Sequence, residues 1–448
     1  MIDNELIKEA LEIINIIEDS GYEAYIVGGS LRDSLLGMQP KDIDIASSAS
    51  PTEIKRIFNS YKTIDTGIDF GTVTLIYNNK PVEITTFRSE SVYLDSRRPD
   101  SVSFEKNVDE DLKRRDFTIN AMAYNKSKNL IDLFSGEKDL SDKLIRCVGN
   151  PDERFSEDAL RMLRAVRFAC VLDFDIEKNT FESIKRNAFR INDISKERIQ
   201  TELNKILLSD KASSGIRLLL DANLLDHILS EIAKMSGFNQ HSPFHHLELL
   251  EHTLCVVDKV EPKIQLRLAA LFHDAGKVDK ATIDENGIGH FYGHDVVSED
   301  ITRVVLKRLK YSNEIIDSTS KLVKYHMIQS NDIGKRGIQK LLRVFGKEDI
   351  FDLADLHFAD SSCTTMQIDE DVFRLKVEQV LDENIPFSVK DLDIDGYDLI
   401  KIGAKGKQIG DILNELLELV SEDGSKNNKD ELMRYAREVY LKYKDLLK

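Results

Sequence analysis

The segment VGGSLRDSLLGMQPKDIDIA, residues 27–46, restricts the possible folds of this chain more than any other feature. A short apolar strand, EAYIV, runs into Gly28 and Gly29, and a second strand, KDIDIA, follows with carboxylates at alternate positions. Glycines after a strand let backbone N–H groups approach a phosphate without a Cβ in the way. Asp42 and Asp44 are two residues apart in a strand, so both side chains leave the same face. The segment therefore predicts a phosphate-binding bend beside a carboxylate pair.

The carboxylate pair predicts a magnesium site. Two carboxylates on one face provide oxygen ligands for Mg²⁺, the metal that accompanies triphosphates, and Arg32 is placed to reach phosphate oxygens. Two aspartates in this spacing are by themselves more often a solvated strand face, and a glycine pair is more often an ordinary turn. Their order and spacing together favour the functional interpretation. Glu83 in VEITTF either completes a carboxylate trio or is a plain exposed strand residue.

The pattern along the chain predicts an α+β protein, with strands gathered near its start. The stretch GTVTLIYNNKPVEITTF indicates a hairpin around Asn78-Asn79. After Pro151 the periodicity is helical, with little strand signal. We expect four domains, namely a head over residues 1–145, a neck over 146–235, a histidine-rich region over 236–362 and a tail over 363–448.

Composition excludes several classes of protein. The chain has 448 residues and a net charge of 62 − 79 = −17, so any nucleic acid must be held by local basic patches and not by the overall field. Its four cysteines form no CxxC motif, and we expect no disulfide framework. We expect neither a signal peptide nor a membrane span, and therefore a cytoplasmic location without a membrane partner.

The glycine and aspartate motifs resemble those of a known family. GGSLRDSLLG at residues 28–37, followed by Asp42-Ile43-Asp44, is similar to the head pattern of the nucleotidyltransferases that include bacterial CCA-adding enzymes and poly(A) polymerases, class II of the polymerase-β-like superfamily. Leu31 stands where the family usually has valine. The resemblance implies a polymerase-β-like head with a mixed sheet and helices. It also implies that Asp42 and Asp44 bind Mg²⁺ and act in catalysis.

The string RRDFTINAMA, beginning at Arg114, matches a second family motif. The resemblance implies that Arg115 helps to bind phosphates and that Asp116 and Asn120 contact the sugar or orient the site. Arg97 and Arg98 lie in a preceding basic loop, for which solvated charge is the alternative interpretation. The next family motif usually reads DPFGG, whereas residues 132–136 read DLFSG here, without the proline and one glycine.

The string ERFSEDALRMLRAVRF contains a further family motif, EDxxR. Asp158 and Arg161 are one helical turn apart and are expected to point together, as a pair able to read the edge of a base; an ordinary helical ion pair is the alternative. The resemblance implies that this motif selects CTP or ATP without a template. The nucleotide-binding residues expected overall are Gly28, Gly29, Arg32, Arg115, Asp116, Asn120, Asp158, Arg161, Arg164 and Arg167.

Eight of the ten histidines fall between residues 241 and 326. Imidazoles and carboxylates together suit a divalent transition metal, although each histidine taken singly is more often a core or surface residue. The doublet His273-Asp274, with His252 upstream, resembles the HD phosphohydrolase family. The ligands that this resemblance implies are His252, His273, Asp274, His294, His326 and Asp360. We expect His241, His245, His246 and His290 to be surface or second-shell residues. Lys277 is placed to steady a phosphate.

In the tail, Lys401, Lys405 and Lys407 form a small basic patch that either contacts RNA or is a solvated turn. The complete resemblance is to a CCA-adding tRNA nucleotidyltransferase with an inserted HD domain, in which helical neck, HD and tail domains follow the head. It implies addition of C, C and A to the 3′ end of tRNA from CTP and ATP, with Mg²⁺ in the head. The alternatives are A-only addition, poly(A) synthesis, or an HD phosphohydrolase with an RNA-binding head. The oligomeric state stays unknown.

Overall fold

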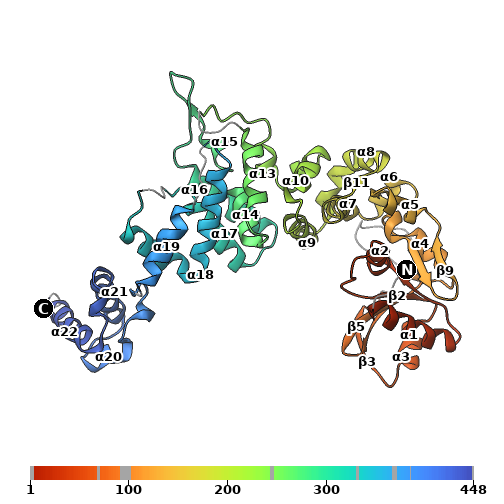
Figure 1. Ribbon diagram of the computed structural model, residues 1–448, viewed down its shortest axis with the longest axis horizontal. Coiled ribbons are helices and arrows are strands. Elements are labelled where there is room, and N and C mark those ends of the chain that lie inside the picture. The colour runs from red at the N-terminus through yellow and green to blue at the C-terminus, as the bar shows by residue number, and fades with distance from the viewer. Residues whose placement is uncertain are drawn as a thin grey trace. The chain divides into compact units, whose positions relative to one another are not determined.

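The computed structural model describes residues 5–67, 71–90, 102–242, 247–328, 332–365, 371–383 and 385–445 (Figure 1). The chain forms two compact units, one of Met1–Lys234 with Val305–Ser312 and the other of Met235–Val304 with Asn313–Lys448. The division into four domains at residues 145, 235 and 362 remains a prediction. None of the helices in the described ranges has the length and apolar character that a membrane crossing requires.

A seven-stranded mixed sheet, in the order β3-β4-β5-β2-β1-β8-β9, forms the base of the head. Only β2 and β5 pair in parallel, and the other pairs in this sheet are antiparallel. The predicted hairpin is confirmed, since Asn78 and Asn79 connect β4 and β5 with φ values of 48° and 62°. The strands of the sheet are β1 Ala24–Val27, β2 Asp44–Ser47, β3 Lys62–Gly67, β4 Thr72–Tyr77, β5 Lys80–Thr86, β8 Met122–Asn125 and β9 Asn129–Asp132.

Helices accompany the sheet and continue into the neck. Burial of one apolar face, which includes Ile7, Ile13, Ile14 and Ile17, explains why residues 5–19 form a helix. The helices before the neck are α1 Glu5–Asp19, α2 Gly28–Leu35, α3 Pro51–Ile57, α4 Val108–Lys113, η2 Thr118–Asn120 and α5 Gly136–Ser141. Those of the neck are α6 Pro151–Glu157, α7 Leu160–Leu172, α8 Lys178–Asn187, η3 Ala188–Asp193, α9 Lys196–Leu207, α10 Ala212–Asp221, α11 Leu225–Ile228 and α12 Ser230–Ala233. Short strand pairs are β6 Arg88–Glu90 with β7 Val102–Phe104, and β10 Leu144–Ile145 with β11 Asp175–Ile176.

In the residues that the structure describes, the second unit consists of helices and the short hairpin of β12 Thr282–Ile283 and β13 Gly289–His290. Its histidine-rich part contains α13 Leu249–Lys259, α14 Ile264–Phe272, α15 Lys277–Lys280, α16 His294–Arg308, α17 Asn313–Tyr325 and α18 Lys335–Ser362. Its remaining elements are α19 Val372–Asp382, η4 Val389–Asp391, α20 Gly396–Lys401, α21 Lys407–Glu422, η5 Gly424–Lys426 and α22 Lys429–Asp445.

Helix α18 is kinked at Gly346, whose φ of 80° and ψ of −175° are not helical. Before the kink, Gln339 donates to the backbone oxygen of Ser421 at 3.1 Å and Arg343 donates to the Ser421 hydroxyl at 2.8 Å. After the kink, the helix carries Asp360. One helix therefore joins the histidine-rich part to the tail.

Candidate functional sites in the head and the histidine-rich region

The bend between β1 and α2 brings three predicted site residues together. Gly28 has a φ of +67°, and a Cβ placed on it would lie 3.2 Å from Nη1 of Arg115 and 3.3 Å from Oδ2 of Asp44. The backbone conformation and the close approach both favour glycine at this position. Residues from three separate segments of the head therefore meet at the end of β1.

The carboxylates lie beside this bend. Asp44 is the first residue of β2 and pairs in register with Glu83 of β5. Asp42 lies before the strand in an exposed bend, so the expectation that both aspartates belong to one strand is wrong, because β2 begins two residues later. Burial raises the pKa of Asp44 to about 6, and the nearby Asp42 and Glu83 carboxylates add to this effect against the opposing charges of Arg115 and Arg32. Negative charge is therefore concentrated around Asp44.

A chain of polar contacts connects the head to the neck. Arg32 donates to Oδ1 of Asn120 at 2.8 Å, and Asn120 donates to Oδ1 of Asp116 at 3.2 Å. Oδ2 of Asp116 accepts from Nε of Arg164 at 2.7 Å. Burial favours the neutral form of Asp116, but the Arg164 guanidinium outweighs it and lowers the pKa of Asp116 to about 2. Four of the predicted nucleotide-binding residues thus form one network.

Three guanidinium groups surround the buried ring of Phe168. The Cζ atoms of Arg32, Arg164 and Arg167 lie 5.0, 5.3 and 3.9 Å from its centroid, distances typical of cation–π contacts. Arg167 is also paired with Glu202 at 2.6 Å. Sequence reasoning missed Phe168, although its position one turn after Arg164 was an available signal.

Asp158 and Arg161 do not lie on one continuous helix. Helix α6 ends at Glu157, Asp158 has an extended backbone, and α7 begins at Leu160. Because the helix is interrupted at Asp158, the expectation that the two residues lie one turn apart on the same helix is wrong. Arg161 instead pairs with Glu157, and Asp158 accepts from Nη2 of Arg198 at 2.6 Å.

The turn at residues 132–136 forms without the proline and glycine that the resemblance led us to expect. The Asp132 carboxylate accepts from the backbone N–H groups of Phe134, Gly136 and Glu137 at 3.3, 2.8 and 3.0 Å. Ser135 occupies the left-handed region with a φ of 60°. One side chain therefore closes this turn. The basic-loop residues Arg97 and Arg98 lie outside the described residues.

The predicted HD residues converge in the second unit. Within the described part of the chain, the groups of three possible metal ligands whose ligand atoms all lie within 4.8 Å of one another are His252-His273-Asp274 and Asp274-His294-His326. Asp274 belongs to both, with its Oδ2 at 3.2 Å from Nε2 of His273 and its Oδ1 at 3.2 Å from Nε2 of His294. Asp360 joins the first group, since its Oδ1 lies 2.9 Å from Nε2 of His252.

The four histidines of these groups all direct Nε2 into the cluster. Their Nδ1 atoms face backbone oxygens, while their Nε2 atoms face the carboxylates or one another. The Nδ1–oxygen pairs are His252 with Cys363 at 3.4 Å, His273 with Ala270 at 2.8 Å, His294 with Phe291 at 2.8 Å and His326 with Val323 at 2.6 Å. This arrangement is typical of metal-ligating histidines, in which the outer hydrogen bond fixes the ring and leaves Nε2 for the ion.

The cluster is buried and strongly charged. Burial lowers the pKa of His273, but the carboxylates of Asp274 and Asp360 outweigh this and hold it above its usual value. Burial alone would raise the pKa of Asp274, yet His273 and Lys277 hold it well below its usual range. Lys277 lies 2.7 Å from Oδ2 of Asp274 and also donates to Oε1 of Gln240 at 3.0 Å. Gln240 is a further residue that sequence reasoning missed, and nothing in its local sequence marks it.

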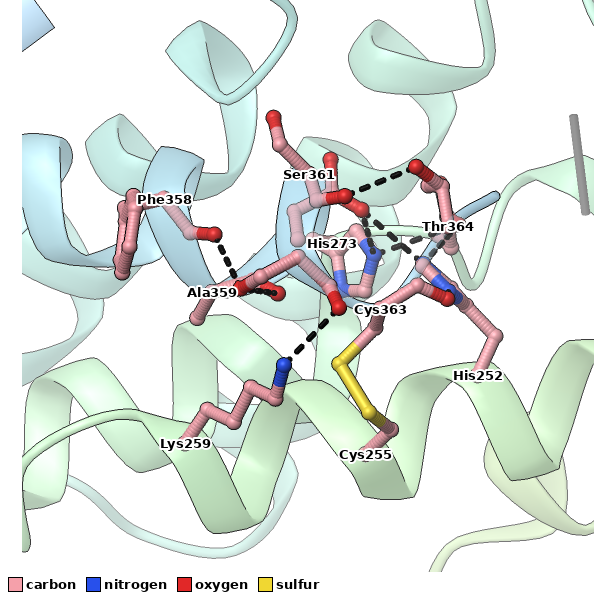
Figure 2. Close-up of a disulfide and its surroundings, with 12 residues drawn as sticks. His252, Cys255, Lys259, His273, Phe358, Ala359, Ser361, Cys363 and Thr364 are labelled. Carbon is pink, nitrogen blue, oxygen red and sulfur yellow. Dashed lines mark hydrogen bonds and ion pairs between the residues drawn. A yellow bond between two sulfur atoms is a disulfide. The ribbon is translucent and has the colours of Figure 1, made fainter. Parts of the chain in front are cut away.

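A disulfide joins Cys255 and Cys363, a single link that the expectation of no disulfide framework did not include (Figure 2). The two cysteines are 108 residues apart, and the packing of α13 against the end of α18 brings them together. Cys147 and Cys170 are free thiols.

Other predicted residues lie outside these groups. His290 pairs with Asp284 at 3.1 Å, and His245 and His246 fall among the residues that are not described. The side chains of Lys401, Lys405 and Lys407 are exposed around α20 and α21. Lys401 is held by Asp398 at 2.8 Å.

Comparison with known proteins places these features in one family. Residues 24–146 match the model of the poly A polymerase head domain, residues 173–235 match the "probable RNA and SrmB- binding site of polymerase A", and residues 293–436 match a model described as tRNA nucleotidyltransferase domain 2, putative. The described head accordingly has the mixed sheet and helices that the resemblance implied.

Curated relatives and solved structures agree with this. A CCA-adding enzyme from Ligilactobacillus salivarius is 54% identical over 217 residues, which is 48% of this chain and about half (53%) of that protein. The CCA-adding enzyme of Pediococcus pentosaceus is 36% identical over 437 residues, covering 96% of this chain and 98% of the relative. The crystal structure of the Bacillus stearothermophilus CCA-adding enzyme with CTP is 27% identical with a TM-score of 0.76, and the match covers 99% of both chains. The chain therefore belongs to the family of CCA-adding enzymes, the nucleotidyltransferases that complete the tRNA 3′ end.

Proposed function

We propose that this chain adds C, C and A to the 3′ end of tRNA without a nucleic-acid template, using CTP and ATP and releasing pyrophosphate. The observation that carries the proposal is the meeting of Gly28, Asp44 and Arg115 at the end of β1. A bend free of side chains, a carboxylate and a guanidinium in contact distance are what binding of a metal–triphosphate complex requires. The likeness to CCA-adding enzymes over 96% of the chain supports this substrate class.

The donor set of the head fits Mg²⁺. Asp42, Asp44 and Glu83 offer only oxygen ligands, and Gly28 leaves room beside Asp44 that a Cβ would fill. Asp42 and Asp44 would hold the ion, and Glu83 would add charge from the neighbouring strand. Mg²⁺ bound there would supply activation of the 3′-hydroxyl and stabilisation of the departing pyrophosphate.

The surrounding side chains would bind and orient the nucleotide. The charges of Arg115 and Arg32 act on the Asp44 carboxyl, and both would bind the triphosphate, while Asp116 accepts from Arg164 and Asn120 accepts from Arg32. Gly28 and Gly29 would offer backbone N–H groups to phosphate oxygens.

Base selection is assigned to the segment around the break between α6 and α7. Asp158 accepts from Nη2 of Arg198 and from the backbone N–H of Leu160, and Arg161 donates to Glu157 and to the backbone oxygens of Arg154 and Arg114, so both side chains are held in place at this break. We assign this pair the reading of the base edge, and Arg164 and Arg167 the support of the pocket.

The decisive experiment uses purified protein and tRNA truncated at the discriminator base, with CTP, ATP or both. Growth by three nucleotides with both substrates, and by two with CTP alone, is the expected result. Growth by a single A, and only on tRNA that already ends in CC, would show an A-only enzyme. Long A tracts on unrelated RNA would show a poly(A) polymerase.

The proposal also includes the cellular compartment and the surface that would contact tRNA. We place it in the cytoplasm, and we assign the exposed Lys401, Lys405 and Lys407 to contacts with the tRNA backbone.

A second activity, metal-dependent phosphoester hydrolysis, is favoured by the four Nε2 atoms and two carboxylates that converge around Asp274. This donor set suits a divalent transition metal, and such an ion would supply a Lewis acid. Lys277, beside Asp274, would bind the phosphate. The test is hydrolysis of nucleotide phosphoesters by the metal-loaded protein, which His273→Ala should abolish while CCA addition continues. Hydrolysis that survives in His273→Ala would exclude the cluster as its site.

A further inference from the structure

The disulfide lies on the same two helix segments as two of the proposed metal ligands. Cys255 follows His252 by three residues on α13, and Cys363 follows Asp360 by three residues at the end of α18. Each cysteine is therefore one helical turn from a ligand. Figure 2 shows the disulfide linking Cys255, on the helix that carries His252, to Cys363 at the end of α18.

Polar contacts join the same two segments beside the disulfide. Nε2 of His252 lies 2.9 Å from Oδ1 of Asp360, and Nδ1 of His252 lies 3.4 Å from the backbone oxygen of Cys363. Lys259 donates to the backbone oxygen of Ser362 at 2.8 Å (Figure 2). These contacts and the disulfide all fasten the last turn of α18 to α13, so the disulfide sets how firmly Asp360 is held beside His252.

The other half of the cluster is carried by other elements and shares Asp274 with the first half. His294 begins α16 and His326 follows α17, and both approach Oδ1 of Asp274, on the opposite side of the carboxylate from His273. Reduction of the disulfide should therefore weaken metal binding on the His252–Asp360 side more than on the His294–His326 side.

We propose that Cys255–Cys363 is an exchange-active disulfide, closed and opened by dithiols, that controls metal affinity at the His252–Asp360 side of the cluster. The proposed effect of the disulfide on metal affinity rests on the metal site proposed above for the histidine cluster. The proposed disulfide exchange is independent of that site. In the cytoplasmic setting that we propose, thiols are kept reduced, and a disulfide there is usually transient, catalytic or regulatory. Cys255 is partly exposed, whereas Cys363 is buried, so a dithiol would reach the sulfur of Cys255.

The exchange takes place in two steps. A thiolate of the dithiol attacks Sγ of Cys255, the disulfide bond breaks, and Cys363 leaves as a thiolate that takes up a proton. The second sulfur of the dithiol then attacks the mixed disulfide and releases Cys255 as a thiol. The protein gains the two electrons and two protons that the dithiol loses, and an oxidised dithiol reverses both steps.

The first measurement counts thiols on the full-length protein after equilibration with reduced or oxidised dithiothreitol, acid quenching and alkylation in denaturant. We expect two alkylated cysteines, Cys147 and Cys170, after oxidation and four after reduction. Cys255→Ser should show three in both states. The matched control Cys170→Ala, in the neck, should still change by two.

The second measurement titrates each redox form with Co²⁺ alone and follows amide hydrogen exchange in the last turn of α18. Reduction should weaken one of two Co²⁺ sites about tenfold, the size expected for loss of an outer support of a metal ligand. It should also speed exchange near Asp360 but not in α7. Cys255→Ser should have the weaker affinity in both states, and Cys170→Ala should respond like the unaltered protein.

The outcomes separate the two proposals. Four thiols under all conditions, with Co²⁺ bound, would overturn the disulfide exchange and leave the metal site standing. Thiol counts that change between two and four, with equal Co²⁺ affinities and equal hydrogen exchange, would overturn the coupling. Thiol counts that change, with no Co²⁺ bound in either state, would overturn the metal site and the coupling together, while the disulfide exchange would stand.

Discussion

The carboxylates of the head and the histidine cluster of the second unit differ in how much of a metal site exists before any substrate arrives. In the head, Asp42 is exposed, Asp44 carries a raised pKa, and the ligands are oxygens only. In the second unit, four imidazoles and Asp274 are buried, and each imidazole is fixed through Nδ1. The proposed Mg²⁺ site of the head is therefore incomplete before substrate binds, whereas the side chains of the proposed transition-metal site are already in place.

The difference matches the ions that the two sites suit. Mg²⁺ is usually bound through one or two carboxylates together with substrate phosphates, not by a cage of protein ligands. A transition metal can be held by imidazoles alone, with outer hydrogen bonds fixing their orientation. We therefore expect the head to gain its metal with the nucleotide and the histidine cluster to keep its metal between turnovers.

The strongest test of this contrast removes Asp44. Asp44→Asn should lower the rate of nucleotide addition at least about a thousandfold, equivalent to ~4 kcal/mol of transition-state stabilisation. The metal content of the purified protein should not change. The matched control is Asp65→Asn, which removes an exposed carboxylate paired with Lys55 and should retain full activity. Addition at an undiminished rate by Asp44→Asn would disprove the proposed site.

The complementary variant is His273→Ala. It removes one ligand from the assembled cluster, so the affinity for Co²⁺ or Mn²⁺ should fall by about 100-fold or more, as measured by titration. CCA addition should stay within twofold of the unaltered protein. His290→Ala, whose imidazole pairs with Asp284 outside the cluster, is the control and should keep its metal. Equal metal affinity in both variants would contradict the assembled site.

Removing the charge of Asp116, which belongs to the polar network between the head and the neck, should have a smaller effect. This effect is on the free energy of unfolding and depends on pH. The pKa of Asp116 falls from 3.8 to about 2 on folding, so its charge contributes stability that is present above about pH 4 and lost as pH falls toward 2. Asp116→Asn should therefore cost about 2 kcal/mol at pH 7, and the cost should shrink below pH 4. Urea unfolding followed by circular dichroism between pH 3 and 7 measures the difference. A cost that is the same at all these pH values would show that Asp116 is not paired as a charge.

The smallest effect is expected in the tail. Lys405→Ala with Lys407→Ala should weaken tRNA binding about three- to tenfold and lower the slope of log affinity against log salt by about two. Filter binding over a range of salt concentrations measures both quantities. Lys307→Ala, which removes an exposed lysine of α16, is the control. A slope that does not change would mean that these lysines are only solvated.

Features encoded in short segments could be predicted from the sequence. The glycine bend, the asparagine hairpin and the His273-Asp274 doublet each depend on residues within a few positions of one another. Helical periodicity likewise marked the neck and the second unit as helical. Short-range sterics and patterning decide such features, and these are visible without the tertiary structure.

Features that depend on distant contacts could not be predicted. The Cys255–Cys363 disulfide requires α13 and the end of α18 to pack together across 108 residues. The extended backbone at Asp158 separates two helices within a string whose periodicity looks continuous, and Arg198, 40 residues later, holds its carboxylate. In both cases tertiary packing overrides the local pattern.

The kink in α18 limits which substitutions the chain can accept at Gly346. A φ of 80° with a ψ of −175° is a conformation essentially restricted to glycine, so Gly346 has no ready substitute. A residue with a Cβ would favour one uninterrupted rod of about 42 Å. Gln339, which holds the tail, and Asp360 lie on opposite sides of that position. The angle between the two segments of α18 therefore depends on one glycine, and a substitution at this single position would be expected to displace the tail relative to Asp360.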